Sequence, residues 1–444
     1  MPPPAEARIK TVKVRQGPFV VDPYEVRYTD PKQRGVRAPK LKGYIVRMHA
    51  RVVDRRGRPI PVRKLMLHHV LYKNLGRFKG DRPRGICNEW KESFYGTGEE
   101  NQPLRLPRGY GYRIRKRDRW QISWMLMNHR PRKLRAYIQY TAKIETRRKL
   151  RHVRPYWVRV TGCGNAVDPI YDVPGGGPPG STHLRSLDFR LRRAGRIVAA
   201  NAHVHGGSKG LLISQPGCGN RQLMLSRPRY GHPNHPYYNV LPVLHEPGPF
   251  ASSWPRTRTG IPIGPGERLR LRSLYDGELP HTRVMGIMHV YVDHARARRP
   301  RAASCAPLPS DLENWQTRQP GRSQPPRVKV PLTGLDANGR AYTITRPPGT
   351  TRVLYGNAGI KIGGSSFSLR NLSIPLGATV RWKAYDREEK HNATLANGPE
   401  GFSTPNMRKG RSYERRFAKP GTYQIFCSLH PIAMTQTIEV RRGG

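Results

Sequence analysis

The stretch GTYQIFCSLHPIAM, residues 421–434, decides how the C-terminal part of this chain folds. It places Cys427, His430 and Met434 within one short loop that leaves a strand, and His391 lies upstream in EEKHNATL. A thiolate, two imidazoles and a weak axial thioether are the ligand set of a blue-copper centre. The pattern therefore predicts one type 1 copper site.

Each ligand type has a role in this prediction. The Cys427 thiolate couples strongly to copper, the imidazoles accept both oxidation states, and the Met434 thioether helps stabilise Cu(I). Such a site shuttles electrons rather than transforming a substrate. His430 precedes Pro431 in the loop, so we expect its ring to lie closest to solvent and to be the port for electrons. A buried cysteine beside unrelated histidines is the alternative, but the spacing of four such residues disfavours it.

Residues 328–444 resemble the plastocyanin, pseudoazurin and amicyanin family. The resemblance includes SLRNLSIPLGATVRWKAYD, in which Gly377 matches the family's hairpin glycine. His430 and Met434 are separated by three residues, a spacing between the amicyanin-like and plastocyanin-like ones. The resemblance implies a cupredoxin Greek-key β-sandwich.

Two histidine pairs stand out further upstream. His203 and His205 are two residues apart on an expected strand, so both rings project from one face, which suits a metal. His68 and His69 are adjacent and would point to opposite faces, unless a bulge or a strand end turns them together.

The order of these pairs resembles the copper monooxygenases of the peptidylglycine α-hydroxylating and dopamine β-monooxygenase family, over roughly residues 40–292. That family has two jelly rolls, each with one mononuclear copper, on either side of a solvent-filled cleft. The resemblance implies two further mononuclear copper sites, the first with His68, His69 and His129 and the second, which would react with O2 and the substrate, with His203, His205 and Met285.

Met288 competes with Met285 for this role, and the family position favours Met285. Two departures speak against peptidylglycine as substrate. Asn201 stands where the peptide-amidating members have an arginine that clamps the substrate carboxylate, and His289 stands where they have a tyrosine.

The rest of the chain is typical of an all-β protein. Short β-rich runs alternate with turn clusters, and 43 prolines with 45 glycines would interrupt most helices. No stretch approaches the ~18 apolar residues that a membrane span needs. We expect two jelly-roll-like β-sandwiches followed by the cupredoxin sandwich, and we place the four segments at 1–162, 163–294, 295–327 (a Pro/Arg-rich linker) and 328–444.

Four cysteines remain besides Cys427, and they can pair in three ways: Cys87, Cys163, Cys218 and Cys305. We expect an extracytoplasmic protein, although the opening MPPPAEARIK lacks the apolar region of a secretory signal. His232 and His235, between prolines, are expected to form a turn without a site. We expect His281, His289 and His294 to be incidental or second-sphere residues.

The leading hypothesis is a copper-dependent, O2-using monooxygenase with a built-in electron-transfer domain. It would take electrons from a small molecule or a redox protein and act on an organic substrate that the sequence does not specify. The first rival is a non-enzymatic electron-transfer protein whose jelly rolls dock a partner. The second is a cell-surface protein whose formal charge of +52 binds anionic polymers. No signature of specific nucleic-acid binding, hydrolase or dehydrogenase chemistry is found.

Overall fold

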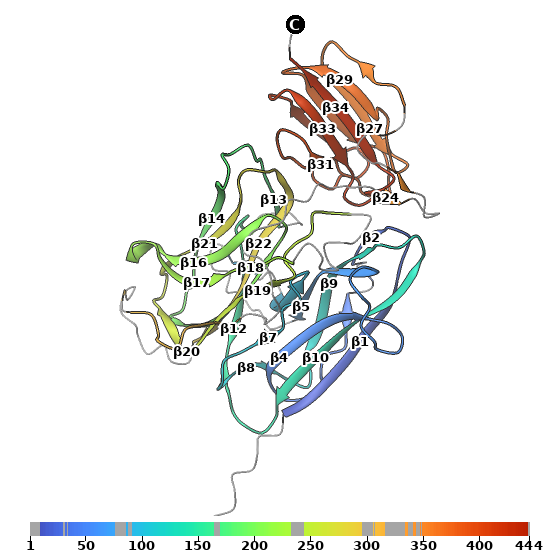
Figure 1. The fold of residues 1–444 in the computed structure, drawn as a ribbon. Coiled ribbons are helices and arrows are strands. Elements are labelled where there is room, and N and C mark those ends of the chain that lie inside the picture. The colour runs from blue at the N-terminus through green and yellow to red at the C-terminus, as the bar shows by residue number, and fades with distance from the viewer. Residues whose placement is uncertain are drawn as a thin grey trace, which may run out of the picture.

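A computed structural model shows that the chain is built from β-strands (Figure 1). Its described residues contain no α-helix, and η2 (Pro216–Cys218) is a short 3-10 turn. They also contain no helix that is long and apolar enough to cross a membrane. The all-β class expected from the sequence is confirmed. The structure describes residues 9–29, 32, 34–75, 86–87, 91–163, 169–231, 244–294, 305, 307–315, 334–335, 341–342, 347 and 349–442.

The first sandwich consists of two sheets. One sheet has the strand order β1 (Ile9–Val21), β10 (Leu134–Glu145), β4 (Gly43–Val53), β8 (Tyr110–Ile114) and β11 (Arg151–His152), with β7 (Leu104–Arg105) beside β4. The other has the order β2 (Val26–Tyr28), β9 (Arg119–Asn128), β5 (Leu65–Leu75) and β6 (Lys91–Gly98), with β3 (Gly35–Val36) beside β9. The strand β5 carries the first histidine pair.

The strands form where apolar and polar residues alternate. In β10, Ala136, Ile138 and Tyr140 point into the core, and Arg135 and Gln139 between them point outward. In β21 (Arg268–Asp276), buried leucines likewise alternate with arginines on the outer face. Much of the positive charge therefore lies on solvated sheet faces.

The second sandwich also has two main sheets. One has the order β12 (Arg154–Arg159), β22 (His281–Asp293), β15 (Gly195–Val204), β20 (Trp254–Ile263) and β23 (Glu313–Trp315), with β13 (Ile170–Val173) beside β22. The other has the order β14 (Thr182–Arg190), β21, β16 (Ser208–Gln215) and β17 (Arg221–Ser226), and β18 (Pro228–Arg229) pairs separately with β19 (Ala251–Ser252). The strand β15 carries His203, His205 follows directly after it, and β22 carries Met285.

Two expected boundaries differ from this arrangement. The strand β12 precedes residue 163 but pairs with β22, so it belongs to the second sandwich. The expected linker contains β23, which pairs with β20, so this part of it extends a sheet instead of spanning freely. Both segments were misplaced because strand partners distant in sequence leave no local signal.

The C-terminal sandwich packs two sheets around Trp382 and Phe417. One has the order β26 (Arg352–Val353), β29 (Asn371–Pro375), β34 (Thr435–Arg441), β33 (Gly421–Phe426) and β31 (Thr394–Asn397). The other has the order β28 (Ser366–Phe367), β27 (Ala358–Gly363), β30 (Thr379–Ala384) and β32 (Ser412–Arg416), and β24 (Gly334–Leu335) pairs separately with β25 (Ala341–Tyr342). In Figure 1 this sandwich lies above the other two, with β31 near β13 and β22.

The two upstream sandwiches share buried contacts. Trp254 and Tyr291 of the second sandwich belong to the hydrophobic core of the first, and the Tyr291 hydroxyl donates to the Phe94 carbonyl at 3.0 Å. Disulfides join Cys87 to Cys163 and Cys218 to Cys305, which resolves the three pairings that the sequence left open. The strands β5 and β15, which carry histidines, therefore belong to two sandwiches that share buried contacts.

Candidate metal centres

The C-terminal site lies at one end of the C-terminal sandwich. His391 forms an isolated bridge with Met407, Cys427 follows β33, and His430 lies in the next turn. One ligand atom from each of His391, Cys427 and His430 lies within 4.8 Å of the others. The fold therefore brings together three of the four expected copper ligands from two separate stretches of chain.

The loop that follows β33 is closed by its own backbone. The Cys427 amide donates to the Met434 carbonyl at 3.0 Å, and the Met434 amide donates to the His430 carbonyl at 3.0 Å. Met434 is fully buried in the C-terminal core. These backbone hydrogen bonds therefore hold Met434, the fourth expected ligand, close to Cys427.

The ring of His391 has one nitrogen engaged and one open. Its Nε2 lies 2.5 Å from Asp386 Oδ2, and this hydrogen bond lowers the pKa of Asp386. Its Nδ1 is buried and has no hydrogen-bond partner in the described part of the chain. Nδ1 of His430 lies 3.8 Å from Cys427 Sγ. Two imidazole nitrogens and a thiolate sulfur therefore fit a copper ion, with Asp386 orienting one ring.

The two rings differ in exposure as expected. The side chain of His430 is 26% exposed, whereas that of His391 is 0% exposed. Burial lowers the pKa of His430 and raises the pKa of the Cys427 thiol. A neutral imidazole suits a metal, and the buried thiol must release its proton when a metal binds.

Asn392 ties the two ligand-bearing segments together. Its backbone amide lies 3.4 Å from Cys427 Sγ, and its side-chain amide donates to Ser428 Oγ at 2.9 Å. Its side-chain oxygen, Oδ1, accepts from the Ser428 backbone amide at 2.9 Å and from Thr394 Oγ1 at 2.9 Å. This buried residue fixes the segment with His391 against the loop with Cys427.

A second group of potential ligands lies between the two upstream sandwiches. The His68 ring centroid lies 5.3 Å from that of His69, 4.9 Å from that of His205 and 6.4 Å from that of His203. The His203 and His205 centroids are 5.2 Å apart. The structure therefore brings both histidine pairs into one cluster. This corrects the expectation of two separate sites across a solvent-filled cleft.

A β-bulge explains how two adjacent histidines reach one place. In the pairing of β5 with β9, Leu67 faces Leu126 and His69 faces Met125, so His68 is the extra residue. The bulge turns both rings to the same side, and their Nδ1 atoms are 3.1 Å apart. Adjacent strand residues normally point to opposite faces, and a bulge is one of the two expected ways in which His68 and His69 could point the same way.

The position of Met285 follows from strand register. In the pairing of β15 with β22, His203 faces Ile287 and Ala202 faces Met288. Since alternate residues share a face, Met285 lies on the face of His203, and Met288 lies in the opposite core, where it is fully buried. The structure thus favours Met285 over Met288.

His129 lies elsewhere on the sheet. Its backbone amide donates to the Lys64 carbonyl at 3.0 Å, four residues before His68 on the neighbouring segment. At a rise of about 3.3 Å per residue, this places its backbone about 13 Å from His68 along the strand direction. The expectation that His129 completes a site with His68 and His69 stays a prediction.

Three residues of this cluster were missed in the sequence. His245 has its ring centroid 4.9 Å from that of His68, and its Nε2 forms a short hydrogen bond with Glu99. Glu99 Oε1 also lies 3.3 Å from His68 Nε2, and Glu100 Oε1 lies 2.9 Å from His203 Nδ1. The two consecutive glutamates are the one sequence feature that could have pointed to these residues, and it is a weak one. A lone histidine such as His245 gives none.

Burial and charge set the protonation of the cluster. Burial lowers the pKa of His68 and His205, and it lowers the pKa of His69 to about 3. For His203, burial alone would lower the pKa, but the Glu100 carboxylate outweighs it and the pKa is raised. Most of these imidazoles are therefore neutral, as metal ligands must be.

No protein-family model matches the chain. Amicyanin-alpha of Methylorubrum extorquens is 29% identical over 79 residues, which are 17% of this chain and 66% of that protein, just under two thirds of its length. The similarity supports a cupredoxin domain. Among solved structures, an oxidised methionine-to-leucine mutant of amicyanin is 24% identical over 19% of this chain and 81% of that chain, with a TM-score of 0.18. A reduced Cu(I) form of another amicyanin mutant is 28% identical over 20% of this chain and 85% of that chain, with a TM-score of 0.18.

The cupredoxin domain contacts the second sandwich through hydrogen bonds. Asp172 accepts from the Ser403 amide at 2.7 Å and from the Arg283 amide at 2.8 Å. The Arg283 guanidinium donates to the Thr404 carbonyl at 3.1 Å and to Asn406 Oδ1 at 3.1 Å. The domain is therefore docked against β13 and β22.

Residues of this contact lie near both candidate centres. Asn406 Oδ1 accepts from Asn392 Nδ2 at 2.8 Å, next to the cupredoxin ligands. Burial is the main reason why the pKa of His205 is lowered and that of Cys427 is raised, and the Arg283 charge lowers both. Arg283 thus lies close enough to act on both sites.

The other histidines named from the sequence lie as follows. His289 is buried opposite Asn201, and Asn201 Nδ2 donates to the Gly96 carbonyl of the first sandwich at 3.1 Å. The His294 ring contacts the Tyr156 hydroxyl at 2.7 Å. His232 and His235 lie outside the described residues. Asn201 therefore has a structural role between the sandwiches.

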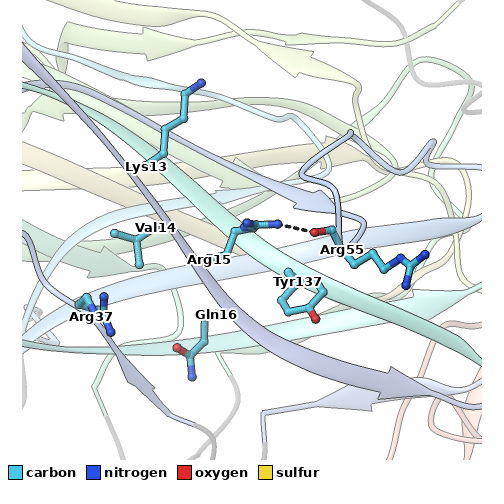
Figure 2. Close-up of a pocket in the computed structure, with 7 residues that line it drawn as sticks. All are labelled: Lys13, Val14, Arg15, Gln16, Arg37, Arg55 and Tyr137. Carbon is cyan, nitrogen blue, oxygen red and sulfur yellow. Dashed lines mark hydrogen bonds between the residues drawn. The ribbon is translucent and has the colours of Figure 1, made fainter.

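A separate basic pocket lies on β1 (Figure 2). It has a volume of about 540 Å³ and is lined by Lys13, Val14, Arg15, Gln16, Arg37, Arg55 and Tyr137. The Arg15 guanidinium donates to the Arg55 carbonyl at 2.6 Å. None of these residues belongs to the two candidate centres.

Proposed function

We propose that this protein is a copper-dependent oxidoreductase in which the cupredoxin domain passes electrons to the histidine cluster between the upstream sandwiches. Copper supplies one-electron redox chemistry at both places. In the cupredoxin domain His391, Cys427, His430 and Met434 would hold it, which is the ligand set of a blue-copper site. Similarity to amicyanin supports a copper-binding, electron-transfer domain.

One observation carries the proposal for the whole chain. Buried imidazoles from both sandwiches meet in one cluster, and the Nε2 atoms of His203 and His205 have no hydrogen-bond partner among the described residues. A buried polar atom without a partner costs about 1–3 kcal/mol, so such atoms point to an absent ligand. A bound metal would satisfy both.

We further propose that the reaction is hydroxylation of an organic substrate. One O2, two electrons and two protons would convert a C–H group into an alcohol and give one water. The cluster reaches solvent, because the side chains of His203 and His245 are 15% and 16% exposed. Met285, on the face of His203, supplies the thioether that favours Cu(I). A small reductant or a redox protein would deliver electrons at His430.

The docked cupredoxin domain supports electron transfer between the two centres. Arg283 binds the cupredoxin loop that contains Thr404, and it lies two residues before Met285 in β22. A donor held in this way needs no diffusional encounter for each electron. The disulfides and the similarity to amicyanin support an extracytoplasmic location.

The test is O2 consumption by the copper-loaded full chain with ascorbate as reductant. We expect Cys427→Ser to abolish the blue absorption and to slow O2 consumption. We expect His203→Ala to keep the blue absorption and to stop O2 consumption. Unchanged O2 consumption in His203→Ala would refute the oxidoreductase proposal and leave an electron-transfer protein.

The rival surface-binding function has one supporting observation. The pocket on β1 presents Lys13, Arg15 and Arg37 together, which suits an anionic polymer. Salt-sensitive binding of the copper-free chain to an acidic polysaccharide, lost in Arg15→Gln, would support it. The two functions can coexist because the pocket shares no residue with the histidine cluster.

A further inference from the structure

The histidine cluster contains potential metal ligands that the two sites predicted from the sequence did not include. His68 lies at the centre of the cluster, because its ring contacts those of His69, His203, His205 and His245. The rings of the cluster come from β5 of the first sandwich, from the end of β15 and the residue after it in the second, and, for His245, from the segment before β19. The cluster therefore belongs to the interface rather than to either sandwich.

The donor atoms fall into two sets. One atom each from His68, Glu99 and His245 lies within 4.8 Å of the others. The remaining rings are His69, His203 and His205, with centroids 6.1 Å apart for His69 and His203. Protein sites for catalytic metals supply about three ligands and leave one position open. The first set therefore has donor atoms close enough for one ion as the side chains stand, and the second set supplies three further imidazoles whose rings would move closer around a second ion.

Buried carboxylates give the cluster a negative charge to be balanced. Glu99 and Glu100 are 9% and 2% exposed, in a chain with 81 lysines and arginines against 29 aspartates and glutamates. Glu100 holds Nδ1 of His203 and leaves its Nε2 directed elsewhere, as carboxylates behind metal-binding histidines do. Cations at the two sets of donors would balance this charge.

A glycine permits the close approach. A Cβ at Gly98 would lie 2.6 Å from His203 Cε1 and 2.5 Å from the His68 carbonyl oxygen. Only glycine lets the ring from the second sandwich reach the strand edge of the first. The two histidine pairs can meet for this reason.

We propose that these residues form one shared centre for two copper ions. His68, Glu99 and His245 bind one ion, and His69, His203 and His205 bind the other, which is also the ion that the Met285 thioether of the proposed function would bind. Glu100 is a positioning residue. The inference rests on the proposed function only for the choice of copper. It adds His245 and Glu99 as ligands, and it makes the two ions neighbours instead of distant partners.

The first experiment counts copper in the full chain and records its electron paramagnetic resonance spectrum. We expect one blue copper plus two more that lie about 4 Å apart, so that their signal is broadened or lost through spin coupling. His245→Ala should lose one copper and restore an uncoupled signal from its neighbour. The blue signal should persist and serves as an internal check that the chain is folded. His152→Ala, which removes an exposed histidine elsewhere, should change nothing.

The second experiment uses a variant that keeps the shape of the site. Glu99→Gln should weaken copper binding at the shared centre about 10- to 100-fold without affecting the blue site. Two uncoupled signals of full intensity, with His245→Ala and Glu99→Gln unchanged, would overturn the shared centre while leaving separate-site oxidation intact. A coupled pair without O2 consumption would instead support the centre and refute the proposed function.

Discussion

His281 is held as a cation inside the second sandwich. Burial alone would lower its pKa, but Glu246, 2.8 Å from Nδ1, and Asp276, 3.8 Å from Nε2, raise the pKa to about 9. The ion pairing also lowers the pKa of Asp276. His281 therefore has a structural role as the centre of this ion-pair network.

The raised pKa predicts how stability depends on pH. The unfolded value is 6.5, so the contribution is fully present below about pH 6.5 and is lost as the pH rises through about 9. It amounts to at most about 3 kcal/mol. Thermal unfolding of the metal-free chain should therefore show a midpoint that falls over this range. His281→Gln should be less stable at low pH and should have a flatter profile. An equally steep fall in the variant would contradict the assignment.

Asn392 connects the two segments that carry His391 and Cys427. Asn392→Ala removes its hydrogen bonds to Ser428, Thr394 and Asn406, and we expect a loss of about 2–4 kcal/mol. The blue signal should also broaden as the ligand segments separate. Urea unfolding and paramagnetic resonance measure the two effects. Asn397→Ala is the matched control, since this exposed asparagine makes one bond of 3.3 Å to Gln424. Equal effects of the two substitutions would argue against this role.

At the scale of elements, the contact of β13 with the cupredoxin loop is the feature to test. Asp172→Ala leaves the Ser403 and Arg283 amides without their acceptor, at a cost of about 2–4 kcal/mol. We expect calorimetry to show the cupredoxin domain unfolding in a separate, earlier transition. Glu414→Gln is the control. Its ion pair with Arg381 is more than half exposed, so the loss should be below about 1 kcal/mol. A single unshifted transition in Asp172→Ala would mean that the contact does not hold the domain.

At the scale of the whole molecule, the docked donor predicts unimolecular kinetics. After the blue copper of the fully loaded chain is reduced, its reoxidation under O2 should be first order, with a rate that does not depend on protein concentration. Arg283→Ala should slow it, because the guanidinium binds Thr404 and Asn406 across the contact. Stopped-flow absorbance of the blue band provides the measurement. A rate proportional to protein concentration would show that electrons pass between molecules instead.

The parts of this protein that the sequence predicted depend on short stretches of chain. Cys427, His430 and Met434 lie within one loop, so the length of the loop alone limits how far apart they can be. Short β-rich runs between turn clusters likewise predicted the all-β class. The spacing of His203 and His205 predicted a shared face because side chains in a strand repeat every second residue.

Tertiary structure decided what meets across long separations. The bulge at His68, the glycine at residue 98 and the packing of β15 on β6 bring four predicted histidines together and add His245 and Glu99. The same packing pairs Cys87 with Cys163. Local patterns set which way a side chain points along its own strand. The distance between two strands more than a hundred residues apart depends on how whole sandwiches bury their surfaces, which no single stretch of sequence encodes.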